Sequence, residues 1–199
     1  MNAVAPEHLV DLDQVSLDLL FQVIAATYRS PTTALTDDIA SGAFDAALER
    51  LAAATGTEAP TLVTPELRTL RTLQAGYVDL FVSSRRGIAA APYVGAAIDG
   101  ELMGPSAQQL GAAFAAHGIE LTDAWRDLPD HIAAVAEGGS LLVRRSEDDA
   151  ARDLLAEFIA PWFAASAAAI TARDDTGFYG PVTRFLDGAI KEVTREVRS

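Results

Sequence analysis

The chain has 199 residues, a formal charge of −13 and no cysteine. This length suffices for one domain with a hydrophobic core, and the missing cysteines exclude disulfides, thiolate metal sites and thiol nucleophiles. The negative charge disfavours nucleic acid and anionic membrane surfaces as partners and favours a basic partner. One lysine stands against 14 arginines, so the acidity is equally compatible with adaptation to a salty cytoplasm or with a GC-rich genome.

The sequence shows no pattern of export or of membrane insertion. Its first residues include Glu7, Asp11 and Asp13 but no Lys or Arg, unlike the start of a signal peptide. No window approaches the roughly 18 uninterrupted apolar residues of a membrane span, and the Ala-rich run 164–170 is too short. We therefore expect a cytoplasmic protein without stable membrane insertion, with residues 1–14 as a flexible N-terminus.

The first half of the chain reads with a helical period. A first helix is capped by Asp13 or Ser16 and ends before Pro31. A second helix is predicted over 38–54 and stops at Gly56. The residues expected to face inward on these two helices are Leu17, Leu20, Phe21, Ile24, Phe44, Leu48 and Leu51.

A third helix is predicted to start at Thr64-Pro65-Glu66, which combines a cap, a proline in the first turn and an acid near the positive end of the dipole. From residue 83 to 105 the period fails and Gly, Ala and Pro take over, which predicts a long loop of the kind that is often functional. The apolar stripe of the helix is Leu67, Leu70, Leu73, Tyr77, Leu80 and Phe81.

Four further helices are predicted in the second half of the chain. The first covers about 105–117, and the second begins at Asp127-Leu128-Pro129-Asp130. The third begins at a capping box, Ser146-Glu147-Asp148-Asp149, and the fourth covers about 180–197. Pro161 should break or kink the third of these helices. With no alternating strand pattern, repeat or linker, the prediction is an all-α protein, one helical bundle domain over 1–199 with its core at about 15–195.

The pair Gly138-Gly139 is unusual inside a predicted helix. Two glycines cost about 2 kcal/mol relative to alanine in a helix interior. Either the helix ends at this pair or another backbone approaches closely. Both alternatives are compatible with the wall of a groove, and the first is the more common.

Asp130, His131 and Glu137 are the best candidates for acid–base chemistry. Adjacent helical residues point about 100° apart, so Asp130 and His131 do not form a dyad, whereas Glu137 lies two turns beyond Asp130. The resulting carboxylate ridge with His131 beside it has three interpretations. It could be the centre of a small helical enzyme, an ordinary helix start in which the aspartates cap free amides, or a patch that binds arginine through bidentate bonds.

No metal site or nucleotide loop is indicated, since His8, His117 and His131 lie far apart and no Walker-type loop, Gly-x-Gly-x-x-Gly or Gly-x-Ser-x-Gly motif occurs. Tyr77, Leu80 and Phe81 have the spacing of a core stripe, although the Tyr77 hydroxyl needs a partner if it is buried. Pro92-Tyr93, in the loop, is a better candidate for an exposed aromatic contact.

Several short motifs, in this order and at this spacing, resemble the TorD/DmsD family of cytoplasmic molybdoenzyme chaperones. The resemblance covers about 15–195. Two signatures are modified: Ala91 replaces a proline, and only Glu137 remains of two acids that usually follow Asp-His. The motifs are Tyr77…Leu80-Phe81, Ala91-Pro92-Tyr93, Gly104-Pro105-Ser106, Pro129-Asp130-His131, Phe158-Ile159-Ala160-Pro161-Trp162 and Phe178-Tyr179.

The resemblance implies an all-α chaperone without enzymatic activity, resident cofactor or metal. It would bind the twin-arginine signal peptide and the apo form of a DMSO-reductase-type enzyme, assist insertion of its molybdenum cofactor and delay export. Apolar groove residues would take the hydrophobic segment, and Asp130 and Glu137 would meet the arginines. The implied peptide-binding residues are Tyr77, Leu80, Phe81, Pro92, Tyr93, Gly104, Ser106, Asp130, His131 and Glu137.

Two alternatives remain open at this point. A NarJ-like assembly factor for a nitrate reductase or ethylbenzene dehydrogenase type of enzyme would also recognise an N-terminal segment. A helical adaptor that binds another basic peptide would differ only in its ligand. The client is not identified, and both a monomer and a domain-swapped dimer are compatible with the sequence.

Overall fold

The computed structural model describes residues 12–62, 69–123 and 125–194. Within these ranges the chain is all-α, as predicted, and the β-pairing is one isolated antiparallel bridge between Tyr93 and His131. The helices are α1 (Gln14–Tyr28), α2 (Thr33–Ser41), α3 (Ala43–Thr55), α4 (Leu70–Tyr77), α5 (Val94–Ile98), α6 (Pro105–Ala116), α7 (Ile132–Arg144), α8 (Asp148–Leu154), α9 (Ala160–Arg173) and α10 (Tyr179–Thr194), with π-helical turns η2 (Val78–Val82) and η3 (Leu155–Ile159).

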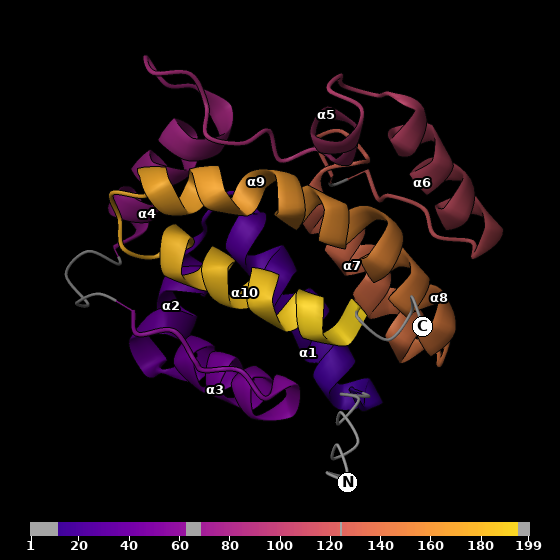
Figure 1. Ribbon diagram of the computed structural model, residues 1–199, viewed down its shortest axis with the longest axis horizontal. Coiled ribbons are helices and arrows are strands. Elements are labelled where there is room, and N and C mark those ends of the chain that lie inside the picture. The colour runs from indigo at the N-terminus through magenta and orange to yellow at the C-terminus, as the bar shows by residue number, and fades with distance from the viewer. Residues whose placement is uncertain (1–11, 63–68, 124, 195–199) are drawn as a thin grey trace, which may run out of the picture.

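The helices form a bundle in which α9 and α10 lie side by side on one face, with α1 and α7 behind them (Figure 1). The pair α2 and α3 lies at one end of the bundle, and α5 and α6 lie at the other (Figure 1). The inward-facing residues predicted for α1 and α3 are all buried. Strong helical periodicity therefore identified the packed faces correctly.

The first helix begins where the sequence predicts. The Asp13 carboxylate accepts a hydrogen bond from the Ser16 backbone N–H at 2.7 Å, so Asp13 is the N-cap. At the other end, Tyr28 is fully buried and its hydroxyl hydrogen-bonds the Thr183 hydroxyl at 2.7 Å. This bond joins the end of α1 to α10.

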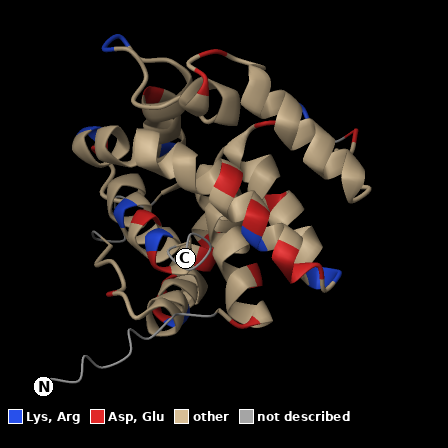
Figure 2. Cartoon of the chain, turned by 45° about the vertical axis from the view of Figure 1, so that its right-hand side comes forward, with Lys and Arg blue, Asp and Glu red and all other residues tan. Residues whose placement is uncertain are grey.

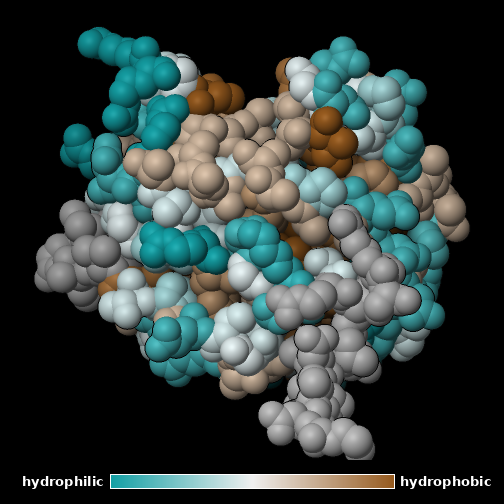
Figure 3. Space-filling view, in the orientation of Figure 1, coloured by the Kyte–Doolittle hydropathy of each residue, from teal (hydrophilic) through white to brown (hydrophobic). Residues whose placement is uncertain are grey.

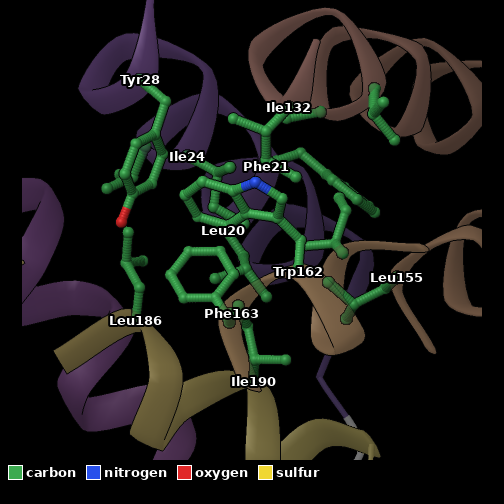
Figure 4. Packing of buried hydrophobic residues seen from close by; sticks show 14 of the residues in the cluster. Leu20, Phe21, Ile24, Tyr28, Ile132, Leu155, Trp162, Phe163, Leu186 and Ile190 are labelled. Atoms are coloured by element: carbon green, nitrogen blue, oxygen red, sulfur yellow. The ribbon is translucent and has the colours of Figure 1, made fainter. Parts of the chain in front are cut away.

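An aromatic cluster fills the centre of the bundle (Figure 4). The Trp162 ring packs edge-on against Tyr28 at 4.9 Å and against Phe163 at 5.1 Å between ring centres. The Trp162 indole N–H donates to the Ala91 carbonyl at 3.0 Å, which satisfies its polar end. The core therefore holds in place the loop that carries Pro92 and Tyr93.

Two predicted segments divide differently in the structure. The helix predicted over 38–54 is two helices, because Gly42 adopts the left-handed conformation with φ 81° between α2 and α3. The loop predicted over 83–105 contains the short helix α5. The predicted helix start at Thr64-Pro65-Glu66, the stripe residue Leu67, His8 and the end of the last helix beyond residue 194 lie outside the described residues.

The expectation that α7 ends at Gly138-Gly139 is wrong, and the structure agrees better with the other alternative, a close approach, since α1 packs tightly against α7 here. The helix runs through both glycines to Arg144, and aromatic rings take the space of the missing side chains. A Cβ atom on Gly138 would lie 2.7 Å from the Phe114 ring, and one on Gly139 would clash with the ring of Phe21. Gly139 therefore allows α1 to pack closely on α7, and Gly138 leaves room for the Phe114 ring of α6.

The predicted capping box at 146–149 does not form. Ser146 has a positive φ of 60° and Glu147 stands at the N-cap of α8 without a side-chain bond to the helix. The Glu147 carboxylate instead meets Nδ1 of His117 at 2.5 Å. Because its partner lies on the α6 side of the bundle, tertiary pairing replaces the local cap.

Pro161 does not end its helix. The π turn η3 precedes it, and the Ala160 N–H bonds to the Leu155 carbonyl five residues back. This wider turn accommodates the proline, so α8, η3 and α9 form one helical stretch over Asp148–Arg173. Within the described ranges this stretch alone is long and apolar enough to cross a membrane, and half of its most apolar window is buried inside the bundle, as in the core helix of a globular protein.

Candidate functional site

The motif residues of two distant segments meet at the start of α7. The Val94 N–H donates to the Asp130 carbonyl at 2.9 Å, and the Ile132 N–H donates to the Pro92 carbonyl at 2.8 Å. These two bonds form the bridge between Tyr93 and His131. The fold thus brings Pro92-Tyr93 and Asp130-His131 together, and we refer to Tyr77, Tyr93, Asp130 and His131 as the motif centre.

Asp130 is fully buried within the motif centre. Its Oδ2 accepts from the Gly95 N–H at 3.0 Å, at the start of α5, while its Oδ1 has no hydrogen-bond partner among the described residues. A Cβ atom on Gly95 would lie 3.0 Å from the Glu101 carbonyl and 3.3 Å from Asp130 Oδ2. Gly95 is therefore the residue that allows this close approach, and Asp130 joins α5 to α7.

His131 is the N-cap of α7, a role that the sequence analysis gave to the aspartates. Its Nδ1 accepts from the Ala133 N–H at 3.1 Å, so the neutral ring carries its proton at Nε2. Nε2–H then donates to the Tyr77 hydroxyl at 3.2 Å. Burial lowers the pKa of His131 to about 4, an effect that the nearby Asp127 carboxylate partly opposes and Arg29 reinforces. His131 is therefore neutral at pH 7.

Tyr77 is buried with His131, and burial raises its pKa well above the ordinary value. Its ring packs against Phe81 at 5.2 Å. Leu80 and Phe81 are 1% and 3% exposed, as the core spacing indicates. Leu80 and Phe81 therefore support the motif centre from inside the bundle.

Pro92 is buried, whereas Tyr93 reaches the surface. The Tyr93 hydroxyl donates to Asp127 Oδ1 at 2.9 Å, and the Tyr93 ring packs edge-on against His131 at 5.5 Å. Partial burial, helped by the Asp127 carboxylate, raises the pKa of Tyr93 to about 12. Tyr93 and Asp127 form the solvent-facing edge of the motif centre.

Gly104 and Ser106 stand at the start of α6, and Gly104 borders the motif centre, since a Cβ atom on Gly95 would lie 3.1 Å from the Gly104 nitrogen and 3.3 Å from Asp130 Oδ2. The Asp99 carboxylate accepts from both the Ser106 N–H and the Ser106 hydroxyl, each at 2.8 Å. A Cβ atom on Gly104 would lie 2.6 Å from Asp99 Oδ2. This Gly-x-Ser element therefore caps a helix, and glycine gives Asp99 the space to do so.

Glu137 and Asp130 do not form the predicted carboxylate ridge. Because α7 begins only at Ile132, Asp130 lies before the first turn and points into the protein, whereas Glu137 is exposed in the middle of the helix. Glu137 Oε1 accepts from the Arg29 guanidinium at 2.7 Å. The Arg29 guanidinium also lies over the Trp125 ring, 5.2 Å from its centre.

A pocket of about 450 Å³ lies between α6, residues 119–122 and α7, and we call it the α6–α7 groove. Arg29, Trp125 and Glu137 border it. Its polar rim includes Arg29 and Glu137. Its apolar lining comprises Phe114, Ile119, Leu121, Trp125, Ala134, Gly138 and Leu141. Of these residues the sequence pointed to Glu137 and, as a groove wall, Gly138; a tryptophan in a loop was the one signal that could have revealed Trp125.

A second hollow of about 760 Å³ lies between α5, α9 and α10 and is lined mainly by small and apolar residues. Apolar atoms also gather over α9 in the face shown in Figure 3. The carboxylate on this hollow, Asp187, already bonds to Lys191 at 2.6 Å. Among the described residues that line this hollow none is aromatic, so it offers less to a guanidinium than the α6–α7 groove, where Trp125 stands beside Glu137.

Charge does not single out one face of the molecule. Acidic and basic side chains are interspersed along the helices in the view of Figure 2. Over the described residues no group of three or more His, Asp or Glu side chains could hold a metal ion. The α6–α7 groove presents apolar and aromatic side chains beside single charged groups.

The comparisons with known proteins agree with this fold. The family model for the nitrate reductase delta subunit matches residues 38–168, well over half of the chain. The solved structure of a candidate redox enzyme maturation protein from Archaeoglobus fulgidus is similar with a TM-score of 0.52 and 19% identity, over 94% of this chain and 96% of that one. No curated protein matches the sequence. The chain belongs to the nitrate reductase delta subunit family.

Proposed function

We propose that this protein is a non-enzymatic chaperone for the maturation of a redox enzyme, acting in the cytoplasm as one domain over 1–199. Family membership supports this proposal, and so does the shared fold with a candidate redox enzyme maturation protein. Its ligand would be an N-terminal segment of the catalytic subunit, bound before the cofactor is inserted. We propose a protein without stable membrane insertion that acts as a monomer or as a domain-swapped dimer.

The observation that carries the proposal is the α6–α7 groove. It combines an apolar lining with the Glu137 carboxylate and the Trp125 ring at its rim. Carboxylates accept paired hydrogen bonds from a guanidinium, and aromatic faces attract it. A segment with arginines followed by an apolar run, which is the composition of a twin-arginine signal peptide, fits this arrangement.

The buried motif residues would then position the groove rather than contact the peptide. His131 caps α7, which carries Glu137, and Asp130 ties α5 to the start of the same helix. Tyr93 and Asp127 would extend the contact surface beyond the groove. Gly104 and Ser106 would act by fixing the first turn of α6, the helix that supplies Phe114.

Two classes of client enzyme remain candidates. A DMSO-reductase-type enzyme with a molybdopterin guanine dinucleotide cofactor and a twin-arginine leader follows from the resemblance of the motifs. A nitrate reductase or ethylbenzene dehydrogenase type of enzyme is favoured by the family model, whose description is the nitrate reductase delta subunit. Both would present an N-terminal segment to the same groove.

Calorimetric titration with leader peptides encoded by neighbouring molybdoenzyme genes tests the proposal. We expect micromolar binding that weakens when the two arginines are replaced by lysines, because lysine cannot form paired bonds with a carboxylate. A twin-arginine leader and a nitrate-reductase-type N-terminal segment, titrated in parallel, distinguish the two clients. A folded protein that binds neither would contradict the proposal.

A further inference from the structure

An ion pair within the chain crosses the α6–α7 groove. Arg29 follows directly after α1, where the chain turns into an extended conformation before Pro31. Its guanidinium reaches Glu137 Oε1 at 2.7 Å and stacks over Trp125 at 5.2 Å from the ring centre. The protein's own arginine therefore makes the two contacts that an arginine ligand would seek.

Buried groups hold both partners of Arg29 in place. The Trp125 indole N–H donates to the Leu128 carbonyl at 3.2 Å, and its ring packs against His131 at 5.6 Å between ring centres. Glu137 stands on α7, whose first turn is capped by the same His131. The carboxylate and the aromatic face are thus fixed with respect to each other through His131, which is 2% exposed.

The ion pair also separates two pockets. Arg29 and Glu137 line both the α6–α7 groove of about 450 Å³ and a second pocket of about 270 Å³ between α1 and α7. The second pocket is lined further by Gln22, Ala25, Ala26 and Ser140. Movement of Arg29 away from Glu137 would join the two pockets into one groove that crosses α7.

Such a movement requires little free energy. The Arg29 and Glu137 side chains are 48% and 45% exposed, and exposed ion pairs contribute little to stability. An arginine from a ligand would remake the two contacts that Arg29 loses, with Glu137 and with Trp125. The exchange is therefore nearly balanced, and the remaining contacts of the ligand decide its direction.

We infer that Glu137 and Trp125 form a guanidinium subsite that Arg29 occupies in the free protein, and that an arginine of the bound peptide displaces Arg29. This inference rests on the proposed function, for which it names the arginine-recognising groups. It makes Arg29 an internal competitor. The apparent dissociation constant for an arginine ligand equals the intrinsic constant divided by the fraction of molecules in which Arg29 has left the site.

The probe is the blocked dipeptide Ac-Arg-Arg-NH2, with Ac-Lys-Lys-NH2 beside it, titrated into ¹⁵N-labelled protein. The sequence has two tryptophans, so two indole N–H signals report. We expect the Trp125 signal to shift with Ac-Arg-Arg-NH2, while the signal of the buried Trp162 stays. The Trp125→Phe variant assigns the signals.

The decisive variant is Arg29→Gln, which should bind Ac-Arg-Arg-NH2 about two- to fivefold more tightly than the natural chain. Arg86→Gln is the matched control, since it removes the same charge from an exposed ion pair with Asp79, outside the groove. The control should leave the affinity unchanged. In Arg29→Gln/Glu137→Gln the gain should disappear, because the site has lost its carboxylate.

Three results would overturn the inference: equal or weaker binding by Arg29→Gln, a similar gain in Arg86→Gln, or a gain that persists in the double variant. The proposed function fails differently. If the dipeptide behaves as expected but no leader peptide binds, the guanidinium subsite stands and the chaperone proposal falls. If leaders bind the natural chain and Arg29→Gln equally, the chaperone proposal stands and the subsite falls.

Discussion

The motif centre and the α6–α7 groove share one helix but differ in solvent access. The motif centre surrounds the first turn of α7, where Asp130 and His131 are 0% and 2% exposed and bond to groups inside the protein. The groove opens along the middle of α7, where Glu137 meets solvent and an exposed arginine. The contrast teaches that most motif residues are buried supports at the start of α7, while the lining of the groove includes only Glu137 and Gly138 of the residues that stood out in the sequence.

The largest effect is expected inside the motif centre. His131→Ala should lower the free energy of unfolding by about 2–4 kcal/mol, because it removes the cap of α7, leaves the Tyr77 hydroxyl without its partner and opens a cavity. Urea denaturation followed by circular dichroism measures this change.

The matched variant is His131→Asn, since asparagine can accept the N-cap bond. It should recover about 1 kcal/mol of the loss. If both variants are as stable as the natural chain, His131 does not organise the start of α7, and the contrast between the two regions disappears.

A second test uses the pH dependence of stability. The pKa of His131 is lowered from 6.5 in the unfolded chain to about 4 in the folded protein. The unfolded chain therefore binds the proton first, so stability is fully present above about pH 6.5 and declines as the pH falls toward 4. The contribution of His131 amounts to up to about 3 kcal/mol.

Because carboxylates titrate in the same range, the measured quantity is the difference between two proteins. The natural chain and His131→Asn should differ in the slope of unfolding free energy against pH between about 4 and 6.5. They should be parallel above that range. Parallel curves throughout would mean that His131 is accessible to water in the folded protein.

The sequence predicted the fold well where apolar periodicity is strong. Residues of α1 and α3 fall on their predicted inward faces because a helix buries every third or fourth residue whatever its neighbours are. The break at Gly42 was missed because a glycine within a continuous period gives no sign of a left-handed conformation. The conformation there depends on how α2 and α3 pack, which is a tertiary effect.

The candidate site was predictable only in part. The motifs located the start of α7, but the predicted ridge of Asp130 and Glu137 required Asp130 to lie on the helix, whereas the helix begins only after its cap His131. Arg29 and Trp125 lie far apart in the sequence. Their contact arises because the fold places the end of α1 beside Trp125. No local pattern encodes that proximity.

The glycines of α7 give a third, smaller effect. Gly139→Ala should destabilise the protein by about 1–3 kcal/mol, because the new methyl group would clash with the Phe21 ring and push α1 away from α7. Gly111→Ala is the matched control in α6, where nothing lies within 4 Å of the added Cβ atom. It should stabilise the protein by about 0.5–1 kcal/mol. Equal effects of the two variants in thermal unfolding would show that the packing of α1 on α7 is loose.

The smallest effect on stability, and the clearest one on binding, is expected at Glu137. Glu137→Gln should change the unfolding free energy by less than about 0.5 kcal/mol, because the Arg29–Glu137 pair is half exposed. The same change should weaken the binding of an arginine-containing leader by about five- to tenfold and flatten its salt dependence, since a charge-assisted pair is lost. Glu157→Gln, an exposed change of equal charge in η3 and outside the groove, should leave leader binding within about twofold of the natural chain. If Glu137→Gln lost stability but kept its binding, the division of roles would be reversed. The groove would then support the fold, and the motif centre would be the candidate contact surface.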